Sequence, residues 1–261
     1  MESITSQRNP RIQLIRSLRQ RKERQETGLF VVEGTFHIGL ALDQKASIEF
    51  VVYADELLST PFSKELIGRI TQAGIPCFQT TRGIFESLGS KENPHGTLAV
   101  AQQRLTAIAA YAPSANSISV ALQEPADPGN LGSILRTLDA VGGEALILVD
   151  GGVDPYHPTA VRAGLGAHFC HPIMHCSFAE FGSWDAQHKV HTIGTSPDSG
   201  SKFRQMAAQR PAVLYLGSER DGLSKEQLSI CDQVVRIPMS GKVNSLNLSV
   251  AAGILLFAMV D

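Results

Sequence analysis

The chain has 261 residues and a formal net charge of −2, from 23 Lys and Arg against 25 Asp and Glu. Hydrophobic residues make up 43% and charged residues 18%, an ordinary globular composition that excludes disordered, collagen-like and disulfide-stapled classes. The length allows one large α/β domain or a small domain joined to a larger one. The near-neutral charge argues against a nucleic-acid partner only if the charges are spread evenly, so their positions matter more than their sum.

Basic residues gather at the start of the chain. Residues 1–104 carry 13 Lys and Arg against 11 Asp and Glu, whereas the remainder carries 10 against 14. Between Arg8 and Arg24, apolar residues recur at helical spacing and predict one amphipathic helix with a basic face. That face is either an ordinary solvated surface or a contact for RNA phosphates. The candidate RNA-binding residues are Arg8, Arg11, Arg19, Lys22 and Arg24.

Strands and helices alternate over the first hundred residues. We expect strands at 28–34, 50–54, 75–80 and 97–102, with helices at 36–42, 61–73 and 81–88. This order predicts a compact α/β domain over residues 1–105. A weakly patterned linker over residues 106–116 follows it.

The second domain, residues 117–261, begins with a strand at 118–125, a polar loop, a helix from Leu131 and a strand at 145–150. Such a β–loop–α–β unit places ligands at the carboxyl ends of parallel strands. Two further strands run into glycine-rich polar loops, at 213–222 and 234–247. A nicotinamide-dependent dehydrogenase is one interpretation, with Gly129 and Gly132 in the turn and Asp150 at the ribose. The G-x-G-x-x-G spacing is absent, however.

Cysteine spacing and the N-terminal sequence both indicate a reducing, cytoplasmic compartment. Cys77, Cys170, Cys176 and Cys231 form no CxxC pair, and the first residues lack an apolar signal segment. The most apolar stretch, residues 246–260, is shorter than a membrane span. It predicts a buried helix, so we expect no membrane partner.

Three motifs of the second domain carry a family resemblance. They are Asn130-x-Gly132-x-x-x-Arg136, the run from Leu216 to Ser224, and the run from Ile237 to Ala251. In this order they resemble the signature motifs of the SpoU (TrmH-like) branch of the SPOUT RNA ribose methyltransferases. The runs 28–34 and 95–100 are similar to the ribosomal-protein-L30-like substrate-binding domain that many members carry.

The resemblance implies a small N-terminal α/β domain followed by a SPOUT α/β domain with a parallel sheet and a C-terminal trefoil knot. It implies methyl transfer from S-adenosylmethionine to a ribose 2′-hydroxyl of structured RNA, ribosomal RNA before transfer RNA. It also implies a homodimer. A catalytically silent RNA-binding protein on the same scaffold is the alternative.

The resemblance also assigns catalytic residues. Arg136 would hold an RNA phosphate or stabilise the developing alkoxide, and the alternative is a surface salt bridge. Asn130 belongs to the active-site cluster and could also cap its helix. Glu219 would order the site, with Arg136 as a possible partner. Ser245 and Asn247, which we expect to open the last helix, would face substrate or cofactor, with Ser245 as a cap.

Cofactor contacts are expected from Gly217, Ile237 and Leu246, with Met239 and Thr195 as further candidates. A glycine at 217 permits close backbone approach to the cofactor. Ile237 and Leu246 would sandwich the adenine, unless they are plain core residues. In the run 161–169, Gly164 stands where many relatives have serine.

A cluster of His and Cys residues invites a metal interpretation. His168, Cys170, His171, His175 and Cys176 lie within nine residues, but their spacing fits no zinc template. We therefore expect an ordinary strand at 167–173 and no metal.

Overall fold

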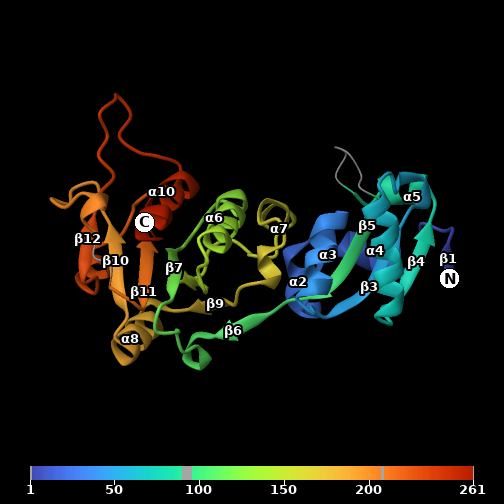
Figure 1. The fold of residues 1–261 in the computed structure, drawn as a ribbon, viewed down its shortest axis with the longest axis horizontal. Helices are drawn as coiled ribbons and strands as arrows, with labels where there is room; N and C mark the ends of the chain where they lie inside the picture. Colours follow the sequence, from blue (N-terminus) through green and yellow to red (C-terminus); the bar gives the residue numbers. More distant parts are fainter. Residues whose placement is uncertain (1, 90–95, 207–208, 261) are drawn as a thin grey trace. The chain divides into compact units, whose positions relative to one another are not determined.

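The computed structural model describes residues 2–89, 96–206 and 209–260, so His95 of the N-terminal motif lies outside it. The chain divides into two compact units (Figure 1). Unit 1 comprises Met1–Gln103 and Tyr156–Phe169, and unit 2 comprises Arg104–Pro155 and Cys170–Asp261. The assignment of residues 1–105 and 117–261 to separate functions stays a prediction.

Residues 156–169 pack with unit 1 although they interrupt the sequence of unit 2. The ring centroid of Phe30 lies 4.6 Å from that of Tyr156 and 5.8 Å from that of Phe169. Gly166 lies against Leu40, where a Cβ atom would come within 2.7 Å of the leucine side chain. Helix α7 (Pro158–Ala163) and the 3₁₀ turn η3 (Ala167–Phe169) belong to this segment. Sequence spacing does not reveal such packing.

Unit 1 is built on a five-stranded sheet in the order β1 (Glu2–Ile4), β4 (Cys77–Thr80), β3 (Ile48–Tyr53), β5 (Thr97–Gln102), β2 (Leu29–Glu33). The first three strands are parallel, and β5 is antiparallel to both of its neighbours. Helices α3 (Thr35–Asp43), α4 (Pro61–Gln72) and α5 (Arg82–Glu86) and the 3₁₀ turn η1 (Asp55–Leu57) connect them. The seven strands and helices expected between residues 28 and 102 are all present, shifted by a few residues at their ends.

The expected single basic helix is two helices, α1 (Pro10–Ser17) and α2 (Arg21–Thr27). The apolar residues of α1, Ile12 and Ile15, are buried in the core of unit 1. Arg24 is only 1% exposed, and its guanidinium donates to the carbonyl oxygens of Leu18 and Arg19, each at 2.8 Å. Arg24 therefore supplies, from within the protein, hydrogen bonds to the carbonyl groups at the C-terminal end of α1. Its assignment as an RNA contact is wrong, because its charged end does not reach the surface.

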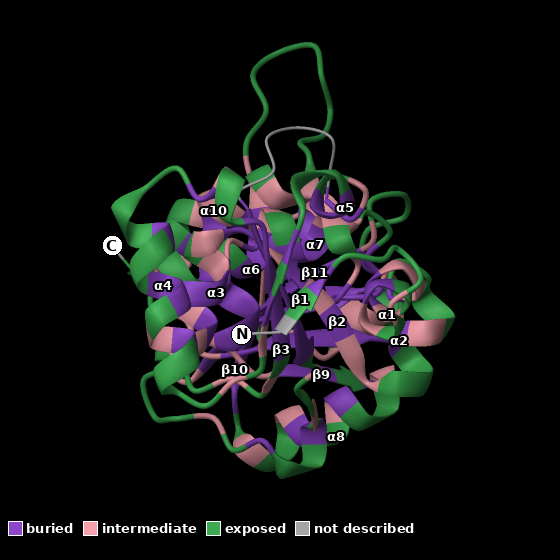
Figure 2. Cartoon of the chain, turned by 90° about the vertical axis from the view of Figure 1, so that its right-hand side faces the viewer, coloured by how far each residue is buried: buried purple, intermediate pink, exposed green. Residues whose placement is uncertain are grey.

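Unit 2 is built on a seven-stranded parallel sheet, which confirms the expected fold class. Its order is β12 (Gln233–Val235), β10 (His191–Thr195), β11 (Ala212–Leu216), β7 (Ile118–Gln123), β8 (Leu146–Val149), β9 (Ile173–Cys176), β6 (Leu105–Ala107). All residues of β7, β8 and β11 are buried, as central strands covered on both faces require (Figure 2). The trefoil knot stays a prediction.

Helices cover both faces of this sheet (Figure 1). On one face, α6 (Pro128–Ala140) packs against α10 (Leu248–Val260), which also contacts β11. On the other, α8 (Phe178–His188) inserts Phe181 and Trp184 into a cluster with Tyr215. Helix α9 (Lys225–Ser229) and the 3₁₀ turn η4 (Phe203–Gln205) lie in the connections around β10–β12. Between β12 and α10 the chain projects as an exposed loop.

Two local expectations are wrong. Residues 106–110, expected in a linker, belong to edge strand β6 (Leu105–Ala107) and the 3₁₀ turn η2 (Ile108–Ala110). The ring of the adjoining Tyr111 stacks on that of Trp184. The backbone carbonyl oxygen of Tyr111 accepts a hydrogen bond of 2.7 Å from the indole N–H of Trp184. The strand expected at 167–173 is instead η3, and β9 begins only at Ile173. Within the described ranges, no helix is long and apolar enough to cross a membrane.

Arg24→Met should lower the free energy of unfolding by about 1–3 kcal/mol, because the carbonyl oxygens of Leu18 and Arg19 would stay buried without that donor. Lys22→Met is the matched control, since Lys22 is exposed and its ion pair is with Glu26 of the same helix. Urea denaturation of both variants measures the difference. Equal stabilities of the two variants would contradict the buried role of Arg24.

Candidate active site

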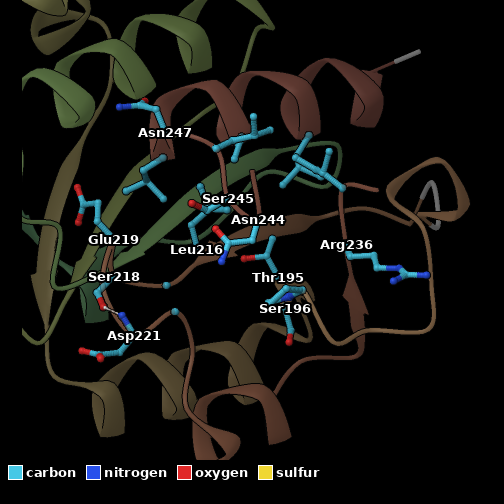
Figure 3. A pocket seen from close by; sticks show the side chains of 18 of the residues that line it. Thr195, Ser196, Leu216, Ser218, Glu219, Asp221, Arg236, Asn244, Ser245 and Asn247 are labelled. Carbon is cyan, nitrogen blue, oxygen red and sulfur yellow. Dashed lines mark hydrogen bonds between the residues drawn. The ribbon is translucent and has the colours of Figure 1, made fainter. Parts of the chain in front are cut away.

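A cavity of about 630 Å³ opens at the carboxyl ends of β10, β11 and β12 (Figure 3). Its walls are the segments that follow these strands, residues 195–197, 216–222 and 235–239, together with residues 244–248 and Asn130. The strand order reverses between β7 and β11, because the chain builds outward from β7 and then returns to the other side. Open parallel sheets bind ligands at this kind of switch point.

The start of α6 contributes Asn130 to the cavity. Asp127 caps the helix by accepting from the backbone N–H of Asn130 at 2.7 Å, and Pro128 occupies the first turn. The expectation that Asn130 itself caps α6 is wrong, because the helix begins two residues before it. The side-chain amide of Asn130 is thereby left for contacts outside the helix.

Glu219 and Asn130 are joined directly. The Asn130 amide donates to Glu219 Oε1 at 3.2 Å. The same carboxylate accepts from the backbone N–H groups of Ala126 at 3.1 Å and Asp127 at 3.4 Å. Glu219 thus fixes the loop after β7 to the loop after β11. It makes no ion pair with Arg136 in the described part of the chain, so the partner expected for Glu219 is wrong.

Asn247 completes a chain of amide contacts at the start of α10. Its amide donates to Asn130 Oδ1 at 2.8 Å, and its own oxygen accepts from the backbone N–H of Ser249 at 2.9 Å. Asn247 is therefore the capping residue of α10. The expectation that Ser245 opens and caps the helix is wrong, because α10 begins at Leu248. Ser245 remains exposed on the cavity wall, and its hydroxyl makes no hydrogen bond to a described residue.

Gly217 is required by its own loop. A Cβ atom at this position would lie 2.1 Å from the backbone carbon of Gly222, since residues 218–222 fold back in a tight turn. The Gly222 N–H donates to the Ser218 carbonyl at 3.1 Å, and Gly222 has a positive φ of 68°. The glycine therefore allows the chain, as well as any ligand, to approach closely.

The other expected cofactor residues also line the cavity: Thr195, Ile237, Met239 and Leu246. Met239 and Leu246 lie on the exposed loop between β12 and α10, so the alternative that Leu246 is plain core is wrong. Thr195 ends β10 with its hydroxyl at the cavity, and Figure 3 shows Arg236 pointing away from it. The sequence analysis did not assign Ser196 and Arg236, which carry no signal beyond following strands, nor Ser218, which lies within the second motif.

Arg136 lies outside the cavity wall. It follows Asn130 by six positions on α6, which places it about 9 Å further along the helix and roughly 120° around it. Its side chain is exposed and makes no hydrogen bond or ion pair with the described residues. The surface salt bridge that is the alternative for Arg136 is not found among the described residues.

The remaining basic candidates lie on unit 1. Arg8 and Lys22 are exposed. Arg11 lies over the ring of Phe78, 3.9 Å from its centroid, and Arg19 donates to the Leu88 carbonyl at 2.6 Å. Arg11 and Arg19 thus contribute to packing whatever else they bind.

The His and Cys cluster does not converge. His171 contacts Asp139 at 2.8 Å, Cys176 is buried in the α8 side of the sheet, and His168 is buried next to Tyr156 in unit 1. A Cβ at Gly164 would lie 2.6 Å from the His168 ring, so the imidazole occupies the space that a serine there would need. Among the residues that the structure describes, no three His, Cys, Asp or Glu side chains are placed to hold a metal ion.

Asp150, the ribose-binding acid of the dehydrogenase interpretation, is occupied elsewhere. It accepts from the Gln123 amide at 2.9 Å and from the Phe178 N–H at 2.8 Å, and it does not line the cavity. Gln123 in turn accepts from the Tyr215 hydroxyl at 2.6 Å. This network supports the sheet edge beneath the loops and offers no dinucleotide site.

Comparison with known proteins places the chain in a family. Residues 117–257 match the SpoU rRNA Methylase family, and residues 9–99 match the MRM3-like substrate binding domain. The 23S rRNA (guanosine(2553)-2'-O)-methyltransferase RlmP of Bacillus subtilis is 27% identical over 98% of both chains. The 23S rRNA (uridine(2479)-2'-O)-methyltransferase of Streptomyces viridochromogenes is 29% identical over 98% of this chain and 91% of its own.

Solved structures agree over the whole chain. An AdoMet-bound rRNA methyltransferase from Sinorhizobium meliloti is 32% identical, with a TM-score of 0.89 over 99% of this chain and 97% of its own. The SpoU methyltransferase AviRb of Streptomyces viridochromogenes, in complex with AdoMet, is 27% identical, with a TM-score of 0.85 over 97% of both chains. With the family match covering more than half of its residues, this chain belongs to the SpoU rRNA methylase family.

Proposed function

We propose that the protein transfers a methyl group from S-adenosylmethionine to a ribose 2′-hydroxyl of ribosomal RNA. The observation that carries the proposal is the Glu219–Asn130–Asn247 chain of hydrogen bonds, which joins one residue from each of the three family motifs at the edge of a ligand-sized cavity. Ribosomal RNA is favoured over transfer RNA because the full-length relatives from Bacillus and Streptomyces are named for it.

The cavity fits the methyl donor in size and lining. Its volume of about 630 Å³ lies within the usual range for small-molecule sites. Thr195, Gly217, Ile237, Met239 and Leu246 would hold S-adenosylmethionine, through the Thr195 hydroxyl, backbone groups of the loops and apolar side chains. When bound, it supplies an electrophilic methyl group.

The protein's own residues must orient the ribose and assist loss of its proton. Glu219, Asn130 and Asn247 use their polar groups on one another, so their role is to hold the loops in place. The Ser245 hydroxyl stays available to a ligand. Arg136, permanently charged, would bind an RNA phosphate or stabilise the developing alkoxide.

Arg136 is not among the residues that line the cavity of its own chain. On α10 an apolar stripe of Val250, Phe257 and Val260 is exposed, and α10 packs beside the helix that carries Arg136. We propose that this stripe forms a homodimer interface, through which Arg136 of one protomer faces the cavity of the other.

Four free cysteines support a reducing cytoplasmic location.

The proposal is tested by incubating the purified protein with radiolabelled S-adenosylmethionine and unmodified ribosomal RNA. We expect label on RNA at a 2′-O-methyl ribose, mapped by resistance of the neighbouring bond to alkaline cleavage. Label on transfer RNA alone would overturn the choice of substrate. RNA binding without cofactor binding would identify a catalytically silent protein.

Arg136→Ala should lower methyl transfer by roughly 100- to 1,000-fold, since a charge that stabilises the transition state is lost. Asn247→Ala should also be inactive. Co-expression of the two variants should restore about a quarter of the wild-type activity, because half of the dimers are mixed and each holds one complete site. A co-expressed pair as inactive as either variant alone would show that Arg136 does not act across the dimer.

Glu219→Gln should lower kcat/KM by roughly 5- to 100-fold, because its new amide would direct N–H groups at the donors on Ala126, Asp127 or Asn130. Glu226→Gln on α9 is the control, because that exposed carboxylate makes no contact with the cavity. Initial rates over a range of RNA concentrations measure both. A Glu219→Gln enzyme as active as the Glu226→Gln control would refute the role of Glu219 in holding the loops.

A further inference from the structure

Two exposed phenylalanines on unit 1 take no part in the site described above. Phe36 lies in the first turn of α3 with 63% of its surface exposed, and Phe62 lies in the first turn of α4 with 44% exposed. Among the described residues of unit 1, they are the only large hydrophobic side chains that are exposed. Each belongs to the segment that matches a substrate-binding domain.

The two side chains flank the same glycine. A Cβ atom at Gly39 would lie 3.3 Å from Phe62 Cζ, so the Phe62 ring covers this position. Phe36 stands one helical turn before Gly39, on a neighbouring part of the α3 surface. A larger side chain at position 39 would press on the Phe62 ring. We call these two aromatic side chains the Phe36–Phe62 patch.

The patch is too small for a second protein chain. A phenylalanine side chain presents about 200 Å² when fully exposed, so the two exposed fractions amount to roughly 200 Å². A stable protein interface covers about 800 Å² on each partner. An area of this size suits one or two flat aromatic ligands.

Charge around the patch does not favour an anion. Lys64 and Glu65 follow Phe62 on α4, and Arg69 pairs with Asp43 at 2.5 Å further along the same two helices. These charges balance, so phosphate groups would find no excess of positive charge there. The faces of nucleic-acid bases bind to aromatic side chains without needing one.

We infer that the Phe36–Phe62 patch stacks unpaired bases of the RNA substrate. The inference rests on the proposed function, because it takes RNA as the substrate. It narrows the substrate class to RNA with unpaired nucleotides, since a base inside a duplex has no free face. Phosphate contacts then come from exposed basic residues such as Arg8 and Lys22, while the patch adds affinity that does not depend on salt.

The test replaces each phenylalanine by leucine, which keeps an apolar side chain and removes the ring. With an unmodified transcript of large-subunit ribosomal RNA, Phe36→Leu and Phe62→Leu should each weaken binding by roughly 5- to 100-fold, the loss of one stacked base. The slope of log affinity against log salt should stay at its wild-type value. Leu105→Ala is the matched control, because Leu105 is 53% exposed on unit 2 and should leave affinity unchanged.

Phe36→Trp should retain RNA binding and add a direct signal. The natural sequence has one tryptophan, Trp184, which is only 3% exposed, so quenching of fluorescence on addition of RNA reports an indole at position 36.

Unchanged RNA affinity of both leucine variants would overturn the inference. An equal loss of affinity of these variants for a fully paired RNA duplex would overturn it as well. A changed oligomeric state of these variants would assign the patch to protein contacts. Failure of the wild-type protein to bind RNA would overturn the proposed function as well.

Discussion

The arrangement of the site depends on the side-chain amide of Asn130. It donates to Glu219 and accepts from Asn247, so one residue joins the loop after β7, the loop after β11 and the start of α10. The amide supplies the donor to Glu219 and the acceptor for Asn247 from one planar group. An aspartate would face the Glu219 carboxylate with a like charge, and an apolar residue would leave two polar partners unsatisfied. Asn130 therefore has a structural role that is separate from any role in the chemistry.

The parallel sheet explains why residues so far apart in sequence meet here. Parallel strands end at the same edge, so the segments after β7, β10, β11 and β12 all reach one side of unit 2. Their conformation is then set by local contacts, such as the cap of Asp127 on α6 and the tight turn over Gly217. The cavity wall consists largely of such loops, which is why side-chain identity at many lining positions carries little sequence signal.

Much of the fold followed from the sequence, because hydrophobic runs separated by polar breaks predict most strands and helices of unit 1 and the strands that lead into the site. They did not predict β1, β6 or the division of the basic helix into α1 and α2. The motif residues led to nine positions on the cavity wall. Spacing did not reveal contacts between distant residues. From the sequence, Arg24 is indistinguishable from the exposed basic residues around it. In the structure its guanidinium donates to the carbonyl oxygens of Leu18 and Arg19. Residues 156–169 likewise read as part of unit 2, although Tyr156 and Phe169 pack on Phe30.

The structure shows how some of the positive charge behind the net charge of −2 is used. Arg24 is buried, and Arg11 lies over the ring of Phe78. Arg19 donates a hydrogen bond to the carbonyl oxygen of Leu88, just after α5. Part of the N-terminal positive charge therefore stabilises unit 1 itself. The charge left for phosphates is smaller than the count of basic residues suggests. Base stacking on the exposed rings of Phe36 and Phe62 would add RNA affinity that does not depend on the number of positive charges.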